Sequence, residues 1–276
     1  IMQVQKRTAA ERVALARHPK RPSPASFIHA LFTDFFEQKG DRLYGDDEAI
    51  IGGIALFHGR PVTVLGHQKG KDLEQNLRCH FGMPMPDGYR KVQRLMRQAE
   101  KFQRPIITFI DTPGAYPGIE AEARGQGEAI ACCLSLMSGL TVPILAVITG
   151  EGGSGGALAL AMGNRVLMLE NAVYSVLSPE GFASILWKDS ARANEACDVM
   201  KLTSYDLLAL GAVDEVIEEP PEGAHENPEP LLHLLDAALQ RNLAWAEKLP
   251  NPLGQRYERY RAMGNGFLYT LGKEGA

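Results

Sequence analysis

Two glycine-rich segments hold the residues best suited to chemistry in this sequence. Residues 111–118 read DTPGAYPG and follow an apolar run, and residues 150–156 read GEGGSGG between another apolar run and a small-residue helix expected from residue 157. Turns without side chains let backbone N–H groups approach a ligand, and a helix start adds unpaired donors and a positive dipole end. The two segments therefore predict a cradle of main-chain amides for an oxyanion.

The side chains around these turns do not suggest acid–base catalysis. Eleven of the 28 glycines lie between Asp111 and Gly163, and no histidine occurs between His80 and His225. Tight packing of strand on helix is the alternative explanation for glycines inside a predicted helix. Asp111 is interpreted as an acceptor that caps a turn. A site rich in amides and poor in bases suits stabilisation of negative charge, where losing one donor slows catalysis about 100- to 1000-fold.

A serine nucleophile is one alternative for the second turn. Residues 152–156 fit the pattern G-x-S-x-G, with Ser154 as the nucleophile. A triad would then need Asp214 with either His225 or His233. His225 falls in a loop rich in Glu and Pro, and His233 lies among leucines of a predicted helix. Both positions disfavour the triad.

Composition excludes several other classes of protein. The chain has 276 residues, 45% of them hydrophobic, and a net charge of −4, which offers no basic face for nucleic acid. No apolar run is long enough to span a membrane and no secretion signal opens the sequence, so we expect a cytoplasmic protein. The four cysteines form no C-x-x-C pair, and we expect reduced thiols and no bound metal.

The elements that must position these turns follow from hydrophobic periodicity. Apolar spacing predicts helices over residues 3–17 and 26–38, which would form an N-terminal helical arm (residues 1–40). Residues 41–276 are expected to form a second unit that carries the turns. Strands are expected at residues 49–57, 61–66, 106–110, 142–148, 165–169, 172–177 and 213–217. Further helices are expected at residues 87–103 (with Asp87 as N-cap), 122–138, 157–162, 179–187, 191–200, 204–210 and 231–249. Strands alternating with helices favour an α/β fold.

Six segments, taken together, carry a resemblance to a known family. They are residues 40–47, 66–71, 81–91, 111–118, 150–156 and 178–181. In these segments the sequence resembles the α subunit of the acetyl-CoA carboxylase carboxyltransferase of bacteria and plastids. The resemblance covers nearly the whole chain, with a leading arm shorter than is usual. It implies a crotonase-like fold of the ClpP/crotonase superfamily, a spiral of ββα units.

The same resemblance implies a reaction and partners. A carboxyl group would pass from carboxybiotin on the biotin carboxyl carrier protein to acetyl-CoA, giving malonyl-CoA for fatty acid biosynthesis alongside biotin carboxylase. The α subunit would pair with a β subunit that carries a zinc ribbon, in an α2β2 heterotetramer with active sites between the two chain types. The lack of a cysteine cluster in this sequence agrees with its being the α partner.

The resemblance also directs attention to particular amides. The oxyanion hole that faces biotin would use the amide of Gly114 or Ala115 in the first turn. The amide of Gly155 or Gly156 would complete it from the second turn. The biotin anion can itself accept the proton from the acetyl group, so little acid–base help from side chains is needed.

Five further residues are candidates for substrate binding. Gly152 and Gly153 would shape the approach to the oxyanion hole, and Tyr116 would pack either on a ligand or in the core. Lys69 and Lys71 could contact CoA phosphates or the carrier protein, although exposed lysines are usually only solvated. The basic side chains between Arg90 and Lys101 are interpreted as a subunit or solvent surface.

Two other interpretations remain open at this point. A crotonase-type acyl-CoA hydratase or isomerase would carry a glutamate in the helix after the glycines, where this chain has Ala157, Leu158 and Ala159. A non-catalytic scaffold would use the glycine turns only for packing. Bulky substitutions in the turns would then affect folding rather than turnover.

Overall fold

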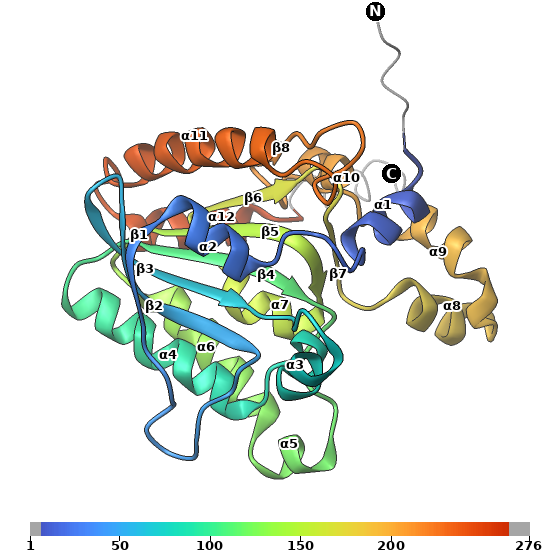
Figure 1. The fold of residues 1–276 in the computed structure, drawn as a ribbon, viewed down its shortest axis with the longest axis horizontal. Helices are drawn as coiled ribbons and strands as arrows, with labels where there is room; N and C mark the ends of the chain where they lie inside the picture. Colours follow the sequence, from blue (N-terminus) through green and yellow to red (C-terminus); the bar gives the residue numbers. More distant parts are fainter. Residues whose placement is uncertain (1–6, 265–276) are drawn as a thin grey trace, which may run out of the picture.

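A mixed eight-stranded sheet forms the centre of the computed structural model, which describes residues 7–264 (Figure 1). Its order is β1-β2-β3-β4-β5-β6-β8, and β7 pairs with the end of β5. The first three strands are antiparallel, and all pairings from β3 onward are parallel. The strands are β1 (Thr33–Glu37), β2 (Ile50–Phe57), β3 (Arg60–His67), β4 (Ile106–Thr112), β5 (Ile144–Gly153), β6 (Arg165–Leu169), β7 (Val173–Ser175) and β8 (Glu215–Ile217).

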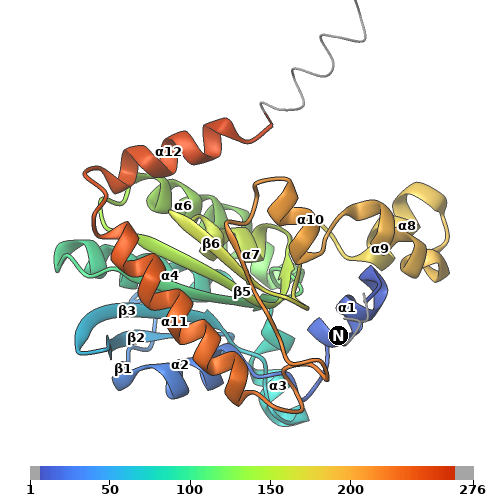
Figure 2. The same ribbon diagram turned by 90° about the horizontal axis from the view of Figure 1, so that it is seen from above.

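Helices cover both faces of this sheet (Figure 2). On one face α4 and α7 lie against the strands, and α6 packs on these two helices. Helices α2 and α11 cover the other face. The helices with bounds in the described residues are α1 (Ala9–Ala16), α2 (Pro24–Leu31), α3 (Leu73–Arg78), α4 (Pro86–Lys101), α5 (Ile119–Ala123), α6 (Gln126–Gly139), α7 (Ser154–Ala161), α8 (Pro179–Trp187), α9 (Ala193–Met200), α10 (Ser204–Ala209), α11 (Glu229–Ala246) and α12 (Pro252–Ala262).

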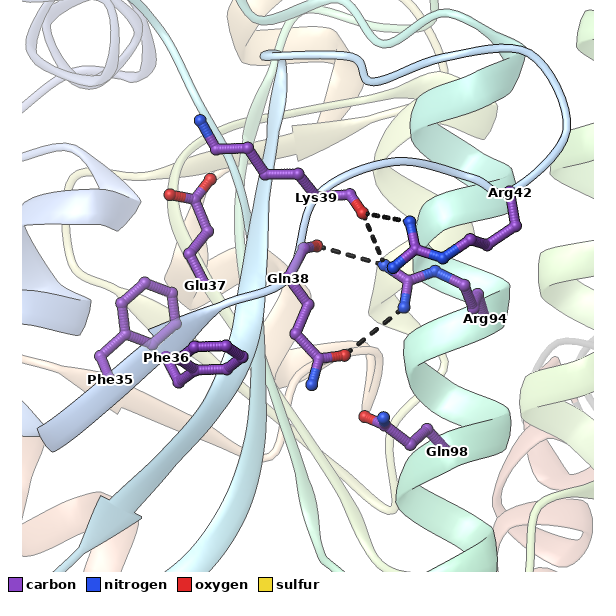
Figure 3. A pocket seen from close by; sticks show the side chains of 8 residues that line it. All are labelled: Phe35, Phe36, Glu37, Gln38, Lys39, Arg42, Arg94 and Gln98. Carbon is purple, nitrogen blue, oxygen red and sulfur yellow. Dashed lines mark hydrogen bonds between the residues drawn. The ribbon is translucent and has the colours of Figure 1, made fainter.

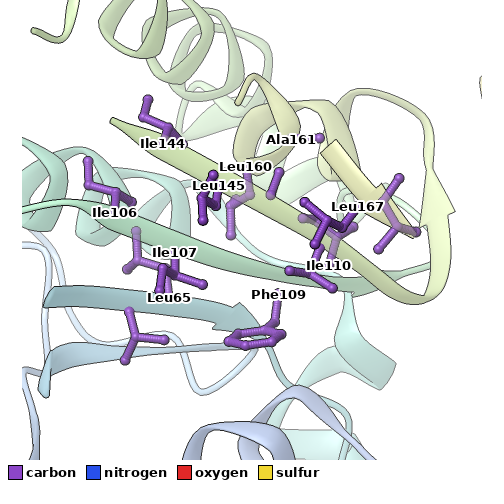
Figure 4. Packing of buried hydrophobic residues seen from close by; sticks show 14 of the residues in the cluster. Leu65, Ile106, Ile107, Phe109, Ile110, Ile144, Leu145, Leu160, Ala161 and Leu167 are labelled. Carbon is purple, nitrogen blue, oxygen red and sulfur yellow. The ribbon is translucent and has the colours of Figure 1, made fainter. Parts of the chain in front are cut away.

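The core lies around the central parallel strands (Figure 4). Every residue of β4 is buried, as are the first seven residues of β5. Near-continuous apolar runs are typical of parallel strands that are covered on both faces. Each run ends in one of the two glycine turns, so the core fixes the strand ends from which the turns begin.

The helix expected over residues 26–38 is wrong in its second half. Helix α2 ends at Leu31, Phe32 is extended, and residues 33–37 form strand β1. Asp34 has a φ of 52°, and the β1–β2 register shifts between Thr33 and Phe36. Pairing with β2 therefore overrides the helical spacing of the phenylalanines. The division of the chain at residue 40 stays a prediction, although β1 already belongs to the sheet.

Other expected elements are confirmed with changed boundaries. The β2–β3 hairpin is present with continuous antiparallel register around His58 and Gly59. The helix expected over residues 122–138 is broken at Gly125, whose φ is 82° and which caps α6. Met85 rather than Asp87 is the N-cap of α4, and the Asp87 carboxylate accepts from Arg124 instead. The predicted helix over residues 3–17 begins at Ala9, and residues 1–6 lie outside the described residues.

The basic side chains on the first half of α4 do not form a solvent surface. Lys91 is buried and donates to Asp46 at 2.6 Å and to the Asp47 carbonyl at 2.8 Å. Arg90 binds Asp41 at 2.8 Å. The loop of residues 40–47 folds over these side chains and supplies their acceptors. The expectation of an outer basic face is therefore wrong for this part of the helix.

Candidate functional site

The two glycine turns meet at one edge of the sheet. Strands β4 and β5 are parallel neighbours, and their register ends with Thr112 opposite Gly152. The carboxyl ends of parallel strands open on the same side, which is where ligands bind in α/β sheets. The fold thus brings together two segments that lie more than thirty residues apart in sequence.

Glycine is required where the two turns touch. A Cβ atom on Gly153 would lie 2.1 Å from the Pro113 carbonyl oxygen, and one on Gly156 would lie 2.6 Å from the Ala115 nitrogen. Gly152 faces the ring of Tyr174, with a Cβ position 2.7 Å from it. Gly155 is different, because the nearest atom to its Cβ position belongs to Ile130 at 3.5 Å. Gly153 and Gly156 serve close packing of the turns, whereas the Cβ position of Gly155 is in ordinary van der Waals contact with α6.

Three of the four predicted donor amides are free to bind a ligand. The N–H of Gly114 is already used, since it donates to the Thr112 hydroxyl at 3.0 Å. Within residues 7–264, no acceptor is found for the N–H groups of Ala115, Gly155 and Gly156, and no side chain caps α7. The Thr112 hydroxyl also donates to the Gly114 carbonyl at 2.7 Å. The free donor of the first turn is therefore the N–H group of Ala115 and not that of Gly114.

Lys69 belongs to a buried charge network beside the turns. Its ammonium group lies 2.6 Å from Asp111 and 3.3 Å from Glu151. Burial opposes the charge of Lys69, but the two carboxylates outweigh it and raise its pKa. Asp111 also accepts from the Glu151 N–H at 3.0 Å, which confirms it as a turn-capping acceptor. Lys69 is thus engaged within the protein, whereas Lys71 is exposed.

A cavity of ≈ 560 Å³ opens next to this network. Pro113 of the first turn and Glu151 of the second both line it, together with Lys69 and Lys71. Its opposite wall is the segment that links α1 to α2. Arg17 at the end of α1 binds Glu151 at 2.7 Å and Glu180 of α8 at 2.6 Å. The N-terminal segment therefore walls a cavity that borders both turns.

Tyr116 lies at the edge of the first turn and is only partly buried. Its N–H donates to the Pro84 carbonyl at 3.1 Å, and its carbonyl accepts from Gln126 at 3.0 Å. Its ring centroid is 5.0 Å from that of His80. These contacts fix the backbone that follows Ala115.

The serine triad is not assembled, although Ser154 sits on a strained turn. Ser154 is exposed and has a φ of 53°, as expected of a nucleophile between a strand and a helix. Asp214, however, accepts from Arg259 at 2.7 Å, and the His225 ring packs 3.9 Å from that of His18. His233 lines a different cavity, beside His58 and Asp236. None of these contacts involves Ser154.

Two site residues escaped the sequence reasoning. His67 at the end of β3 lies against the backbone of Gly156 and Phe109, and Tyr89 of α4 reaches the same glycine. Both are fully buried. His67 precedes the first turn by more than forty residues, so proximity in sequence could not reveal it. Its position within the segment 66–71, which carries the family resemblance, was the available signal.

A larger depression lies elsewhere on the molecule. It measures ≈ 700 Å³ and is lined by β1, the following loop and α4, with Arg42 and Arg94 both hydrogen-bonded to the Lys39 carbonyl (Figure 3). No residue of either glycine turn lines it. In residues 7–264 there is no group of three potential metal ligands, and no helix long and apolar enough to cross a membrane.

Sequence comparison identifies close relatives. The family model described as "Acetyl co-enzyme A carboxylase carboxyltransferase-like" matches residues 3–264. A protein of Anoxybacillus flavithermus named acetyl-coenzyme A carboxylase carboxyl transferase subunit alpha is 58% identical over 259 residues, covering 92% of this chain and 79% of its own. The protein of that name from Bacillus subtilis is 56% identical over 256 residues, with the same coverage.

Solved structures agree on the fold. A chain of a Pseudomonas malonate decarboxylase hetero-tetramer in complex with coenzyme A superposes with a TM-score of 0.71 at 18% identity, covering 93% of this chain and 100% of that one. Transcarboxylase 12S, with methylmalonyl-coenzyme A and methylmalonic acid bound, superposes with a TM-score of 0.65 at 21% identity. The match covers 87% of this chain and 45% of that one. The predicted crotonase-like α/β fold is thereby confirmed.

Proposed function

The chain belongs to the family of acetyl-CoA carboxylase carboxyltransferase α subunits and is a transferase of carboxyl groups, and on that premise we propose its substrates. The carboxyl donor is carboxybiotin on the biotin carboxyl carrier protein, the acceptor is acetyl-CoA, and the product is malonyl-CoA. The relatives' name supports the acceptor, and the amide-rich turns support a donor that leaves behind an oxyanion.

The reaction creates negative charge on oxygen, which the free amides are suited to bind. The ureido oxygen of biotin would become negative as the carboxyl group left as CO2, the anion would take a proton from the acetyl methyl group, and the resulting enolate would bond to the CO2. The N–H groups of Ala115 and Gly155 or Gly156 would hold the ureido oxygen. Donors fixed in place before the reaction need no reorganisation when charge develops, which is the main source of their effect.

The single observation that carries this proposal is that two turns in contact with each other both hold backbone amides without a partner in residues 7–264. Backbone N–H groups without a partner are rare in folded proteins unless a ligand or water completes them. The nearest charged groups, Asp111, Glu151 and Lys69, already neutralise one another in part. The turns therefore offer main-chain dipoles rather than a titrating base.

A second chain is part of the proposal. We expect a β subunit with a zinc ribbon, which would supply the oxyanion hole for the acetyl thioester, in an α2β2 assembly with sites between the subunits. Biotin carboxylase would recharge the carrier protein in the cytoplasm, and malonyl-CoA would enter fatty acid biosynthesis. The family name of an alpha subunit and the multi-subunit structural neighbours support this arrangement.

Reconstitution tests the function directly. The purified chain alone should neither hydrate enoyl-CoA nor transfer carboxyl groups. Addition of the β subunit should produce decarboxylation of malonyl-CoA that depends on free biotin, which is the reverse half of the reaction. Hydration of enoyl-CoA by the chain alone, or a complex whose turnover does not respond to biotin, would contradict the proposal.

Substitution of Gly155 tests the place of the chemistry. The branches of Val at position 155 would press against Ile130 of α6 and displace the start of α7, which carries the unpaired amides, so turnover of the complex should fall at least about 100-fold. Ala at the same position fits at van der Waals distance from Ile130 and should retain most activity. Gly139→Val is the matched control, because position 139 is exposed and has no neighbour within 4 Å of its Cβ position. Equal activity of Gly155→Val and Gly139→Val would exclude the oxyanion assignment.

A further inference from the structure

Two fully buried polar side chains without partners lie next to Gly156 in the candidate oxyanion hole. The Tyr89 hydroxyl and both ring nitrogens of His67 have no hydrogen-bond partner within residues 7–264, and neither residue is exposed to solvent. Leaving a buried polar group unpaired costs about 1–3 kcal/mol. Such groups in a native structure call for a functional explanation.

Both side chains converge on the same glycine. The Tyr89 oxygen lies 2.9 Å from the Cβ position of Gly156, and the Ala115 nitrogen and the Gly114 carbonyl carbon each lie 2.6 Å from that point. The His67 ring lies against the backbone of Gly156 and Phe109. Tyr89 therefore adjoins the peptide group that carries the Ala115 donor, and His67 adjoins the start of α7.

Both groups are uncharged hydrogen-bond donors at neutral pH. Burial lowers the pKa of His67 to about 3, so the imidazole is neutral and keeps one N–H. Burial raises the pKa of Tyr89 well above 10, so its hydroxyl keeps its proton. Neither group titrates near neutral pH, and each can donate one hydrogen bond to a backbone carbonyl.

We propose that Tyr89 and His67 are positioning residues that donate hydrogen bonds to the Gly114 and Gly156 carbonyls when an oxyanion binds. A carbonyl oxygen has two lone pairs, and that of Gly114 uses one for the Thr112 hydroxyl. A second donor on this carbonyl polarises the Gly114–Ala115 peptide and strengthens the Ala115 N–H as a donor. Bonds that are absent at rest and form in the transition state raise kcat rather than affinity.

This inference rests on the proposed function, and the test uses the complete complex with the β subunit. Tyr89→Phe keeps the ring and removes only the hydroxyl. We expect kcat for biotin-dependent malonyl-CoA decarboxylation to fall about tenfold, with KM within about twofold of the parent. The melting temperature should stay unchanged or rise, because the hydroxyl removed has no partner in the resting protein.

Tyr260→Phe is the matched control. The Tyr260 hydroxyl donates to the Ala161 carbonyl at 3.2 Å, at the end of α7 away from the turns. Its loss should lower the melting temperature and leave kcat unchanged, which is the opposite pattern. For His67, His67→Leu should lower kcat about tenfold, and His67→Gln, which retains an N–H donor, should recover part of the loss.

The two proposals fail in different ways. An active parent complex whose kcat is unchanged in Tyr89→Phe and His67→Leu would overturn the positioning role alone. Loss of kcat in Tyr89→Phe together with a melting temperature as low as that of Tyr260→Phe would show a structural role and would also overturn it. An inactive parent complex would overturn the proposed function, and the positioning role with it.

Discussion

Neighbouring glycines in the second turn have different tasks at the scale of single residues. The Cβ position of Gly156 lies 2.6 Å from two backbone atoms of the first turn, whereas that of Gly155 meets only a side chain at 3.5 Å. Backbone atoms cannot move aside as the end of a side chain can. Gly156 therefore fixes how closely the turns approach, and Gly155 instead faces Ile130 of α6.

We expect Gly156→Ala to lower the free energy of unfolding by about 1–3 kcal/mol, because one added methyl forces the turns apart. The same displacement moves the Ala115 amide, so activity should be lost as well. Gly155→Ala should change stability by less than about 0.5 kcal/mol. Urea denaturation of both variants measures the difference, and equal stability would show that the turns tolerate separation.

Lys69 and Lys71 also differ in how much each side chain contributes to stability. Lys69→Met should lower the free energy of unfolding by about 3 kcal/mol, because it leaves the buried Asp111 carboxylate without its cation. Lys71→Met should have little effect on stability, since Lys71 is exposed. Urea denaturation measures both changes. If Lys69 instead served CoA phosphates, its substitution would raise KM for malonyl-CoA and leave stability unchanged.

At the scale of elements, the loop of residues 40–47 holds α4 in place. Asp41 is central to this loop, because it accepts hydrogen bonds from Arg90 and from the N–H groups of Leu43, Tyr44 and Gly45. Burial alone would raise the pKa of Asp41, but these donors lower it from 3.8 to about 2. The carboxylate is thus tuned to stay charged in mild acid.

This shift predicts a dependence of stability on acid. A carboxyl group whose pKa is lower in the folded protein stabilises it above pH 3.8, and that contribution is lost as the pH falls toward 2. Asp41→Asn should be less stable by about 1–2 kcal/mol at neutral pH. Its stability should then change less than that of the parent between pH 4 and pH 2, as measured by denaturation at each pH. Parallel curves for the two proteins would contradict this role of Asp41.

The same elements show what the sequence could and could not predict. The apolar spacing of α4, the β2–β3 hairpin and the strand–turn–helix order at both glycine segments follow from local periodicity, and they are confirmed. Strand β1 does not, because Phe35 and Phe36 have helical spacing and only the neighbouring strand makes them extended. Likewise, Lys91 resembles a surface residue until a distant loop supplies Asp46. Each wrong prediction concerns residues whose structure depends on contacts with segments remote in sequence.

At the scale of the whole molecule, a buried ion pair links the N-terminal segment and the chain before α11 to the sheet. Arg21, which precedes α2, binds Glu219 through both its terminal nitrogens and donates to the Thr149 carbonyl at 2.7 Å. Glu219 also accepts from Asn171 at 3.0 Å. Thr149 lies just before the second glycine turn. The N-terminal segment, β5 and the chain before α11 are therefore held together beside the site.

We expect Arg21→Ala to lower the free energy of unfolding by about 3–5 kcal/mol, because it leaves the Glu219 carboxylate buried without a cation. Adding Glu219→Ala should recover part of this loss, since the unpaired charge is then gone as well. A double-mutant cycle by urea denaturation measures the coupling. Additive losses would show that the two side chains stabilise the protein independently.

A site built from backbone N–H groups responds to amino-acid substitution differently from a site built from side chains. Gly114, Gly155 and Gly156 have no side chain to truncate, and Ala115 is already at the minimum that an alanine scan would test. An alanine scan therefore removes none of these N–H groups, and it disturbs them only where the added methyl forces the turns apart, as at Gly156. Substitutions among homologues should likewise change the side chains around the turns and leave the donor N–H groups in place, because every residue except proline retains an N–H. Mutants that have lost the activity should be sought among substitutions that add atoms here.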